Sequence, residues 1–583
     1  MNYNNIYESL KGAIASASKD ITSDANDHDL FAIEVPKDRS HGDLSTNYAM
    51  ILARKQKKNP VEIANLLRKN LLSHDEFETI EIAGPGFLNF KFKQDFWRSV
   101  LKAVLSLGGD YGRSINKSDQ RVNIEFVSAN PTGPIHIGHA RPAIYGDVLS
   151  NIMEFCGIDV TREYYINDAG GQIVTLVKSA YLRYQESFGA KIIIPSGYYP
   201  GEYLKTLAEE LKKDYGDRFL KNSESGCAYD EPESEFGKIV VDSMMKTIKK
   251  DLAELGIKHN VFFSEKSLHT NGQIENSVNQ LKKDELIYQG FLEAPKGEED
   301  EDWQNREQLL FKSTLFGDDQ DRSITKSDGT WTYFAGDIGY AKSKIERGFK
   351  RNIMILGADH AGYVKRLKAI YKALSKNEAS LEIVLCQMVN FIENGEPIKM
   401  SKRAGNFTTV MDAIKEIGSD ALRFIMLTRK SDVILDFDLN LVKSLSKDNP
   451  IFYVQYARVR ALSILKNASN NFPEIFARFS DNKYDLTFLS LEQEIEIIRD
   501  LSLFPKILES SIQNGELHKV SYYLLNIASS FHSFWNLGKE NDEYKFIGDN
   551  IEISCARLAL VQGILNIITT GLKLMGVTPL DKM

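Results

Sequence analysis

Residues 121–155 read RVNIEFVSANPTGPIHIGHARPAIYGDVLSNIMEF, and this stretch decides the fold. The apolar run at 121–127 predicts a strand, and residues 130–134 (NPTGP) predict a turn. The segment from about 138 to 155 is typical of a helix. A strand, loop and helix in this order form part of a doubly wound α/β unit, in which ligands bind beyond the carboxyl end of the strand. Backbone N–H groups at the start of the helix favour an anion there.

Two short motifs, HIGH at 136–139 and KMSK at 399–402, point to chemistry at a nucleotide phosphate. The imidazoles of His136 and His139 can donate hydrogen bonds to phosphoryl oxygens, and Lys399 and Lys402 can meet the charge of a departing pyrophosphate. Either motif alone fits a structural histidine pair, a metal site or an ordinary basic loop. Both together, in this order and after a strand and a Pro/Gly turn, indicate ATP chemistry with these four side chains as the catalytic residues.

Composition excludes several other classes of protein. At 583 residues the chain should form several domains, and its net charge of −8 argues against a protein that coats nucleic acid indiscriminately. The four cysteines show no spacing typical of metal ligands, so we expect no metal site built by the protein. No long apolar run and no N-terminal leader are evident, which predicts a cytoplasmic protein without a membrane partner.

The pattern of apolar residues predicts three domains. Residues 1–115 should form a small α/β domain, with two strands about a turn at 79–83 and 87–92. Residues 116–440 should form a split nucleotide-binding domain with a mostly helical insertion at about 166–300, and residues 441–583 a helical bundle. Within the second domain we predict further strands at 309–311, 330–334, 352–357 and 382–386.

Longer segments resemble the arginyl-tRNA synthetases among the class I aminoacyl-tRNA synthetases, over nearly the whole chain. They are 125–134 (EFVSANPTGP), 167–172 (NDAGGQ), 356–363 (LGADHAGY), 420–423 (DALR) and 576–583 (GVTPLDKM). The resemblance implies an α/β multidomain protein. It would have a split Rossmann-like catalytic domain with the HIGH and KMSK motifs, a small N-terminal domain that binds the tRNA elbow, and an all-α C-terminal anticodon-binding bundle.

The resemblance also implies an activity and its partners. L-arginine would attack the α-phosphate of ATP, with Mg²⁺ present, to give arginyl-adenylate and pyrophosphate. The arginyl group would then pass to the 3′-terminal adenosine of arginine tRNA. Members of this family need bound tRNA for the first step, and the resemblance further implies a monomer.

Site residues follow from the same resemblance. A guanidinium needs carboxylates in a planar arrangement and an aromatic face, which Tyr333 and Asp337 would offer together if a helix starts after Trp331. The matching positions depart from the family at His360, where some members have glutamine, and at Ala335 and Gly336. The expected ligands of ATP are Pro131, Gly133, His136, Gly138, His139, Gly357, Asp359, Met400 and Ser401. Those of arginine are Glu125, Ser128, Asn130, His136, Tyr333, Asp337 and His360, and those of tRNA are Asn89, Tyr456, Arg458 and Met583.

Three alternatives remain open at this point. Another class I synthetase is one, although a cysteinyl enzyme would need a zinc site of Cys and His that this sequence does not offer. A nucleotidylyltransferase with a similar fold is the second, but it would not need the distant helical region or the segment 420–423. The third is a catalytically inactive paralogue that binds RNA, against which the intact residues of both motifs argue.

Overall fold

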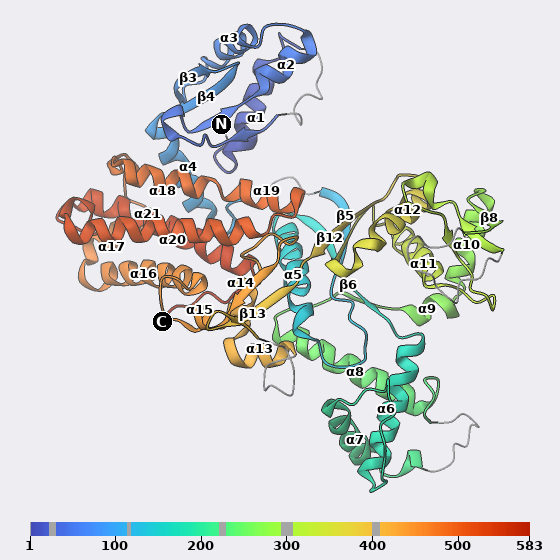
Figure 1. The fold of residues 1–583 in the computed structure, drawn as a ribbon. Coiled ribbons are helices and arrows are strands. Elements are labelled where there is room, and N and C mark those ends of the chain that lie inside the picture. Colours follow the sequence, from blue (N-terminus) through green and yellow to red (C-terminus); the bar gives the residue numbers. More distant parts are fainter. Residues whose placement is uncertain (1, 23–30, 114–117, 221–228, 293–306, 399–408) are drawn as a thin grey trace. The chain divides into compact units, whose positions relative to one another are not determined.

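The computed structural model describes residues 2–22, 31–113, 118–220, 229–292, 307–398 and 409–583 (Figure 1). The chain divides into two compact units. One, named here the central unit, comprises residues 115–444 and 575–577. The other, the terminal unit, comprises residues 1–114, 445–574 and 578–583.

The central unit is built on a five-stranded parallel sheet of order β12-β11-β5-β6-β7. The short 3₁₀ turn Ile137–His139 and helix α5 (Ala140–Phe155) connect β5 to β6 as one crossover. The predicted strands at 121–127, 352–357 and 382–386 and the predicted helix at about 138–155 are therefore confirmed. The five strands are β5 (Ser118–Glu125), β6 (Ile158–Ile166), β7 (Val261–Ser264), β11 (Arg351–Gly357) and β12 (Ser380–Cys386).

Two groups of helices extend the central unit, each around its own apolar core. The first is formed by α6 (Gly171–Ser187), α7 (Glu202–Tyr215) and α8 (Glu235–Glu254). The second contains α9 (Glu265–Thr270), α10 (Gln273–Lys283), α11 (Tyr333–Glu346) and α12 (Val364–Ser375). An antiparallel sheet of β8 (Ile287–Gly290), β9 (Gln308–Phe311) and β10 (Arg322–Ser323) belongs beside this second group.

The predicted strand at 330–334 is wrong. Only Trp331 pairs there, in an isolated bridge with Thr325, and α11 begins two residues later. The side chain of Thr332 accepts a hydrogen bond from the N–H of Ala335 and caps the helix. The run of β-branched and aromatic residues resembled a strand, but its β-branched Thr332 is the N-cap of a helix.

The DALR segment ties the sheet to the end of the chain. It lies in α14 (Ser419–Met426), and the buried guanidinium of Arg423 pairs with Asp147 of α5. The same guanidinium donates hydrogen bonds to the carbonyls of Leu255 (2.7 Å) and Met575 (2.9 Å). A side chain at Gly576 would collide with Arg423, so a glycine is needed there. Arg423 is thus a structural residue of the central unit.

Another sheet of the central unit is formed by strands that come before and after the KMSK motif in the sequence. Strand β13 (Val389–Glu393) pairs with β14 (Glu396–Pro397) and runs parallel to β15 (Leu435–Asp438). Helices α13 (Val410–Ile417), before α14, and α15 (Leu439–Lys443), after β15, complete this region.

The N-terminal part of the terminal unit is a small α/β domain. Its antiparallel sheet has the order β1-β2-β4-β3, and β3 and β4 confirm the two strands predicted about a turn. The strands are β1 (Ile33–Glu34), β2 (Leu44–Thr46), β3 (Phe77–Ala83) and β4 (Phe87–Phe92). The helices are α1 (Ile6–Ala17), α2 (Tyr48–Gln56), α3 (Pro60–Leu71) and α4 (Gln94–Leu107).

The C-terminal part of the terminal unit is the predicted helical bundle. By length and composition its last helix, α21, could cross a membrane, but 72% of its most apolar window is buried inside the protein. It packs against α4, α16, α17 and α20, so it is the core helix of a soluble domain. The helices are α16 (Pro450–Asn471), α17 (Pro473–Ser480), α18 (Glu492–Ser502), α19 (Phe504–Asn514), α20 (His518–Glu540) and α21 (Ile551–Leu574).

Candidate active site and a second pocket

The backbone turns sharply where β5 ends. The N–H of Ser128 bonds to the carbonyl of Phe126 (3.1 Å) across Val127, whose φ is +73°. This is a γ-turn of the rare, strained kind, and a β-branched residue sits at its centre. The hydroxyl of Ser128 accepts a hydrogen bond from the N–H of Tyr165 (3.0 Å) and donates one to Glu125 (3.2 Å). Ser128 therefore fixes the loop to the neighbouring strand β6.

The loop before the HIGH motif is clamped from three elements. The hydroxyl of Tyr164, on β6, donates to the carbonyl of Ala129 (2.6 Å). The N–H of Ile135 donates to Asp251 on α8 (3.1 Å), and its carbonyl accepts from the N–H of Val410 on α13 (2.9 Å). These bonds hold the entry to the motif in one position without any ligand.

Both histidines of the motif stand at the start of α5 as neutral side chains. The Nδ1 of His136 accepts a hydrogen bond from the N–H of Gly138 (3.0 Å), which leaves the proton on Nε2 as an exposed donor. The Nδ1 of His139 is buried and has no hydrogen-bond partner among the described residues. Burial lowers the pKa of His136, and burial together with the nearby His136 lowers the pKa of His139. Two imidazoles at a helix N-terminus can thus bind an anion without carrying charge themselves.

The end of strand β11 completes this edge of the sheet. Met354 pairs in register with Glu125, so the carboxyl ends of β11 and β5 lie together. A 3₁₀ turn, Ala358–Tyr363, follows, and the charge of its Asp359 acts on His139. A Cβ at Gly357 would lie 2.3 Å from the carboxylate of Asp359, so a larger residue there would displace this side chain. The predicted ATP ligands of the two strand ends are brought together by this register.

The KMSK residues Lys399, Met400, Ser401 and Lys402 lie outside the described residues. The chain on either side of them is held firmly. The N–H of Ile398 bonds to the carbonyl of Phe391 in β13 (2.8 Å). Thr409 forms an antiparallel bridge with His136 and, with Asp412, a capping box for α13. Thr409, where the described chain resumes, is therefore paired directly with the HIGH motif.

A cavity of about 790 Å³ opens beside α11 in the central unit. Because α11 begins at Tyr333, Tyr333 and Asp337 lie one turn apart on it, as predicted. Tyr333 lines the cavity and is 75% exposed. Three carboxylates line it: Asp168 before α6, Glu233 before α8 and Glu265 at the start of α9. Asp337 is not among the lining residues, but the charge of Glu265 acts on it.

The pKa values of Asp337 and Glu265 are raised, although two cations also line the cavity. Lys266 pairs with Glu233, and the ammonium of Lys326 lies 5.8 Å from the centre of the Tyr333 ring. Burial raises the pKa of Asp337 to about 7, with further raising by Glu265 and Glu125 and a partial offset by Arg366. Burial, helped by the charge of Asp168, also raises the pKa of Glu265 to about 7. The Oε2 of Glu265 is buried and has no hydrogen-bond partner among the described residues. A cation placed between Asp337 and Glu265 would return both to the ionised form.

Asp168 differs from Glu265 because its oxygens are already engaged. It accepts hydrogen bonds from the hydroxyl of Ser264 (2.5 Å) and the N–H of Lys266 (2.9 Å), and so orients the start of α9. Sequence reasoning missed both carboxylates. The signal for Glu265 was its place directly after β7, and that for Asp168 its place two residues after the end of β6.

Glu125 and Asn130, predicted as ligands of arginine, are engaged with other side chains. The carboxylate of Glu125 pairs with the buried ammonium of Lys344 at 2.6 Å. The amide of Asn130 accepts from Asn167 (2.7 Å) and donates to Gln172 (2.6 Å). These bonds shape the wall of the site. His360, the remaining predicted ligand, follows β11 and lies 3.5 Å from Asp359.

The four predicted tRNA ligands fall into two groups in the terminal unit. Asn89 is a buried residue of β4. Arg458 is only 8% exposed and is held by Thr569 (3.1 Å), Asp581 (3.0 Å) and the carbonyl of Leu580. Tyr456 and Met583, by contrast, are largely exposed. Of this set, Tyr456 and Met583 present side chains to solvent.

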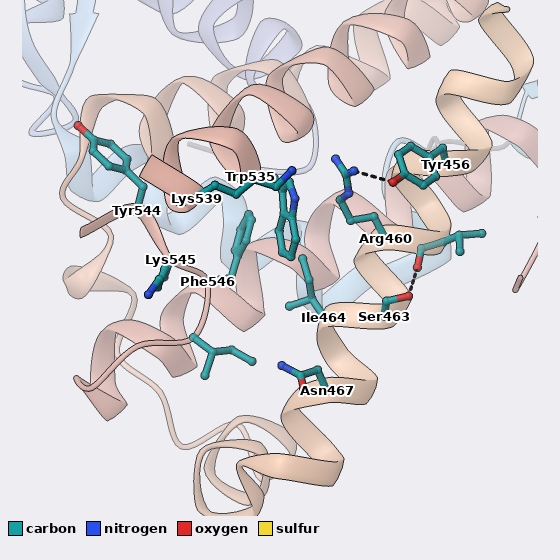
Figure 2. A pocket seen from close by; sticks show the side chains of 13 residues that line it. Tyr456, Arg460, Ser463, Ile464, Asn467, Trp535, Lys539, Tyr544, Lys545 and Phe546 are labelled. Atoms are coloured by element: carbon teal, nitrogen blue, oxygen red, sulfur yellow. Dashed lines mark hydrogen bonds between the residues drawn. The ribbon is translucent and has the colours of Figure 1, made fainter. Parts of the chain in front are cut away.

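Tyr456 forms part of a second cavity, of about 610 Å³, between α16, α20 and the segment after α20 (Figure 2). The guanidinium of Arg460 lies 4.5 Å from the centre of the Tyr456 ring and 5.3 Å from that of Trp535. Phe546 lies 6.2 Å from Trp535 in a stacked arrangement. Aromatic faces beside cations suit an unpaired base and its phosphate. Sequence reasoning missed Arg460 and Trp535, although Arg460 follows Tyr456 by one helical turn.

Three family models match the chain, in succession along it. The "arginyl tRNA synthetase N terminal domain" matches residues 4–92. The "tRNA synthetases class I (R), catalytic domain" matches residues 100–457, and the "DALR anticodon binding domain" matches residues 454–583.

Individual relatives agree with the family models. An arginine–tRNA ligase of Rickettsia felis is 50% identical, over 99% of this chain and 100% of its own. A solved structure from Campylobacter jejuni is 33% identical with a TM-score of 0.72, over 84% of this chain and 100% of its own. The arginyl-tRNA synthetase of Thermus thermophilus, 17% identical with a TM-score of 0.70 over 99% of this chain and 100% of its own, shares the fold. This chain belongs to the arginyl-tRNA synthetase family, within the class I aminoacyl-tRNA ligases.

Proposed function

We propose that this chain activates L-arginine with ATP at the edge of the central sheet and transfers it to the 3′-terminal adenosine of arginine tRNA. The observation that carries the proposal is the pair of carboxylates Asp337 and Glu265, of which Glu265 is buried, near the exposed ring of Tyr333. A guanidinium is a planar cation that takes carboxylates and an aromatic face together. No neutral side chain would balance the charge of these two carboxylates.

The phosphate end of the site is the HIGH motif. The Nε2–H of His136 and the side chain of His139 would donate hydrogen bonds to oxygens of the α-phosphate as the carboxylate of arginine attacks it. These donors are fixed before ATP arrives, which is the arrangement that stabilises charge developing in a transition state. Lys399 and Lys402 would neutralise the departing pyrophosphate.

Mg²⁺ would enter with ATP and would be held mainly by phosphate oxygens and water, as this ion usually is in such sites. The exposed carboxylate of Asp359, close to His139, is the side chain that fits it at the phosphate end. When bound, the ion would neutralise charge on the phosphates. His136 and His139 would still align the α-phosphate.

The terminal unit would hold the tRNA, with Tyr456 and Met583 as contacts in its helical part. As part of the same proposal, the protein would be a monomer located in the cytoplasm, without a membrane partner. It would require bound tRNA to activate arginine. These properties follow from the likeness to the family.

The test is ATP–pyrophosphate exchange, run with each of the twenty amino acids, with and without arginine tRNA. Exchange should respond to arginine alone, and only when the tRNA is present. Exchange with another amino acid would overturn the assignment of arginine. Exchange with arginine in the absence of tRNA would overturn the proposed tRNA requirement and leave the substrate assignment standing.

A further inference from the structure

His532 contacts the guanidinium of Arg460, a residue that lines the second cavity. His532 is a residue of α20, 5% exposed, and its Nδ1 lies 2.6 Å from an Nη of Arg460. Its Nε2 lies 3.4 Å from the carbonyl of Tyr453 on α16. Its ring also packs 4.7 Å from that of Tyr453 and 5.5 Å from that of Tyr456.

These contacts define the protonation of His532. Arginine only donates hydrogen bonds, so the Nδ1 must accept, and the proton must be on the Nε2 facing the carbonyl of Tyr453. The imidazole is therefore neutral. Burial, with the nearby charge of Arg460, lowers the pKa of His532 to about 4, in agreement with this geometry.

The neutral His532 is an acceptor for Arg460, whose guanidinium is held at two points. One Nη donates to His532, and the other donates to the hydroxyl of Tyr456 (2.8 Å), as Figure 2 shows for the second bond. A long flexible side chain is thereby fixed beside the rings of Tyr456 and Trp535, with Asn467 further along the same cavity. Without the buried acceptor, the guanidinium would be held by Tyr456 alone.

We infer that His532 is a positioning residue for tRNA recognition, because it presets Arg460 to meet an unpaired base and its phosphate in this cavity. The inference rests on the proposed function, since it concerns the tRNA of that reaction. His532 itself does not line the cavity and acts only through Arg460. Its effect is expected on tRNA affinity and not on arginine or ATP.

Two substitutions separate the acceptor from the ring. His532→Phe keeps an aromatic ring against Tyr453 and Tyr456 but removes the Nδ1, whereas His532→Asn keeps an acceptor and removes the ring. The readout is steady-state aminoacylation with full-length arginine tRNA. His532→Phe should raise the KM for tRNA about tenfold, as expected for loss of one bond to a charged group, with the KM values for arginine and ATP unchanged. His532→Asn should raise it less.

Two controls complete the test. With a minihelix that lacks the anticodon arm, wild type and His532→Phe should have equal kcat/KM. In an Arg460→Lys background, His532→Phe should have no further effect on the KM for tRNA.

An unchanged KM for full-length tRNA in His532→Phe, an equal loss with the minihelix, or a larger loss in His532→Asn than in His532→Phe would each overturn the inference. Failure of the wild type to charge arginine tRNA would instead overturn the proposed function.

Discussion

The two cavities of this protein differ in the charged side chains that they contain. In the central unit, Asp337 and Glu265 are carboxylates whose pKa values are raised to about 7 because burial favours their neutral forms. In the terminal unit, Arg460 is a cation already braced by His532 and Tyr456 beside exposed rings. A small cationic ligand would balance the charge of Asp337 and Glu265. In the second cavity, tRNA instead meets side chains that are already held in position. Loss of any one of them should weaken tRNA binding without stopping the reaction.

The largest effect is expected at Asp337. Asp337→Asn removes the charge that a guanidinium would balance, and arginine-dependent exchange should fall about 1,000-fold in kcat/KM, as for loss of a buried charged partner. Glu346→Gln, on the same helix but exposed to solvent, is the matched control and should leave exchange unchanged. A fall of less than tenfold in Asp337→Asn would mean that this carboxylate does not select the substrate.

The reaction itself should depend on the HIGH motif. His136→Ala removes a fixed donor to the phosphate and should lower the kcat of exchange about 100-fold, the usual effect of losing one such donor. Because His136 is in the central unit, the dissociation constant of tRNA, measured by filter binding, should not change. A weaker tRNA complex with unaltered kcat would contradict the proposed role.

Acidic pH should weaken arginine binding and leave tRNA binding unaffected. Asp337 and Glu265 take up protons as the pH falls through about 7, so the KM for arginine should rise about tenfold per pH unit between 7 and 6. Their raised pKa values also mean that these two groups favour the folded state more at pH 6 than at pH 8. A KM for arginine that stays constant from pH 8 to 6, measured by exchange at saturating ATP and tRNA, would show that these carboxylates are not titrating partners of the substrate.

A smaller change is expected when the ring at Tyr456 is removed. Tyr456→Ala should raise the KM for tRNA about tenfold, because one stacking surface is lost. Tyr456→Phe keeps the ring and loses only the hydroxyl that accepts from Arg460, so it should have an intermediate effect. If the two variants behave alike in aminoacylation, the hydroxyl and not the ring is the important group.

The smallest effect on tRNA is expected at Arg458, two residues before Arg460. Arg458→Met should lower the free energy of unfolding by about 2 kcal/mol, since it removes the hydrogen bonds of a buried guanidinium to Thr569, Leu580 and Asp581, and should leave the KM for tRNA unchanged. Arg460→Met should raise the KM for tRNA. Urea denaturation and aminoacylation of both variants test this pair. A large rise of the KM in Arg458→Met at full stability would restore Arg458 as a tRNA ligand.

Sequence patterns predicted the parts of the fold that depend on neighbouring residues. The strand, turn and helix around the HIGH motif were predictable because an apolar run, a Pro/Gly turn and a helix-like segment follow one another directly. Tyr333 and Asp337 were predictable as a pair because one helical turn brings them together.

The remainder of the site depends on contacts between distant segments. Glu265 joins Asp337 because α9 packs against α11, which no local pattern specifies. Arg458 and Arg460 share a helix, but the C-terminal residues pack on the face of Arg458 and leave that of Arg460 open. The helix alone could not distinguish them.

The most direct test compares arginine with citrulline, its neutral isostere, in ATP–pyrophosphate exchange with arginine tRNA present. We predict that wild-type protein prefers arginine at least about 1,000-fold in kcat/KM, because citrulline leaves both carboxylates unbalanced. In Asp337→Asn the preference should fall sharply. Exchange with citrulline within tenfold of that with arginine in the wild type would contradict the assignment of the carboxylate cavity to the arginine side chain.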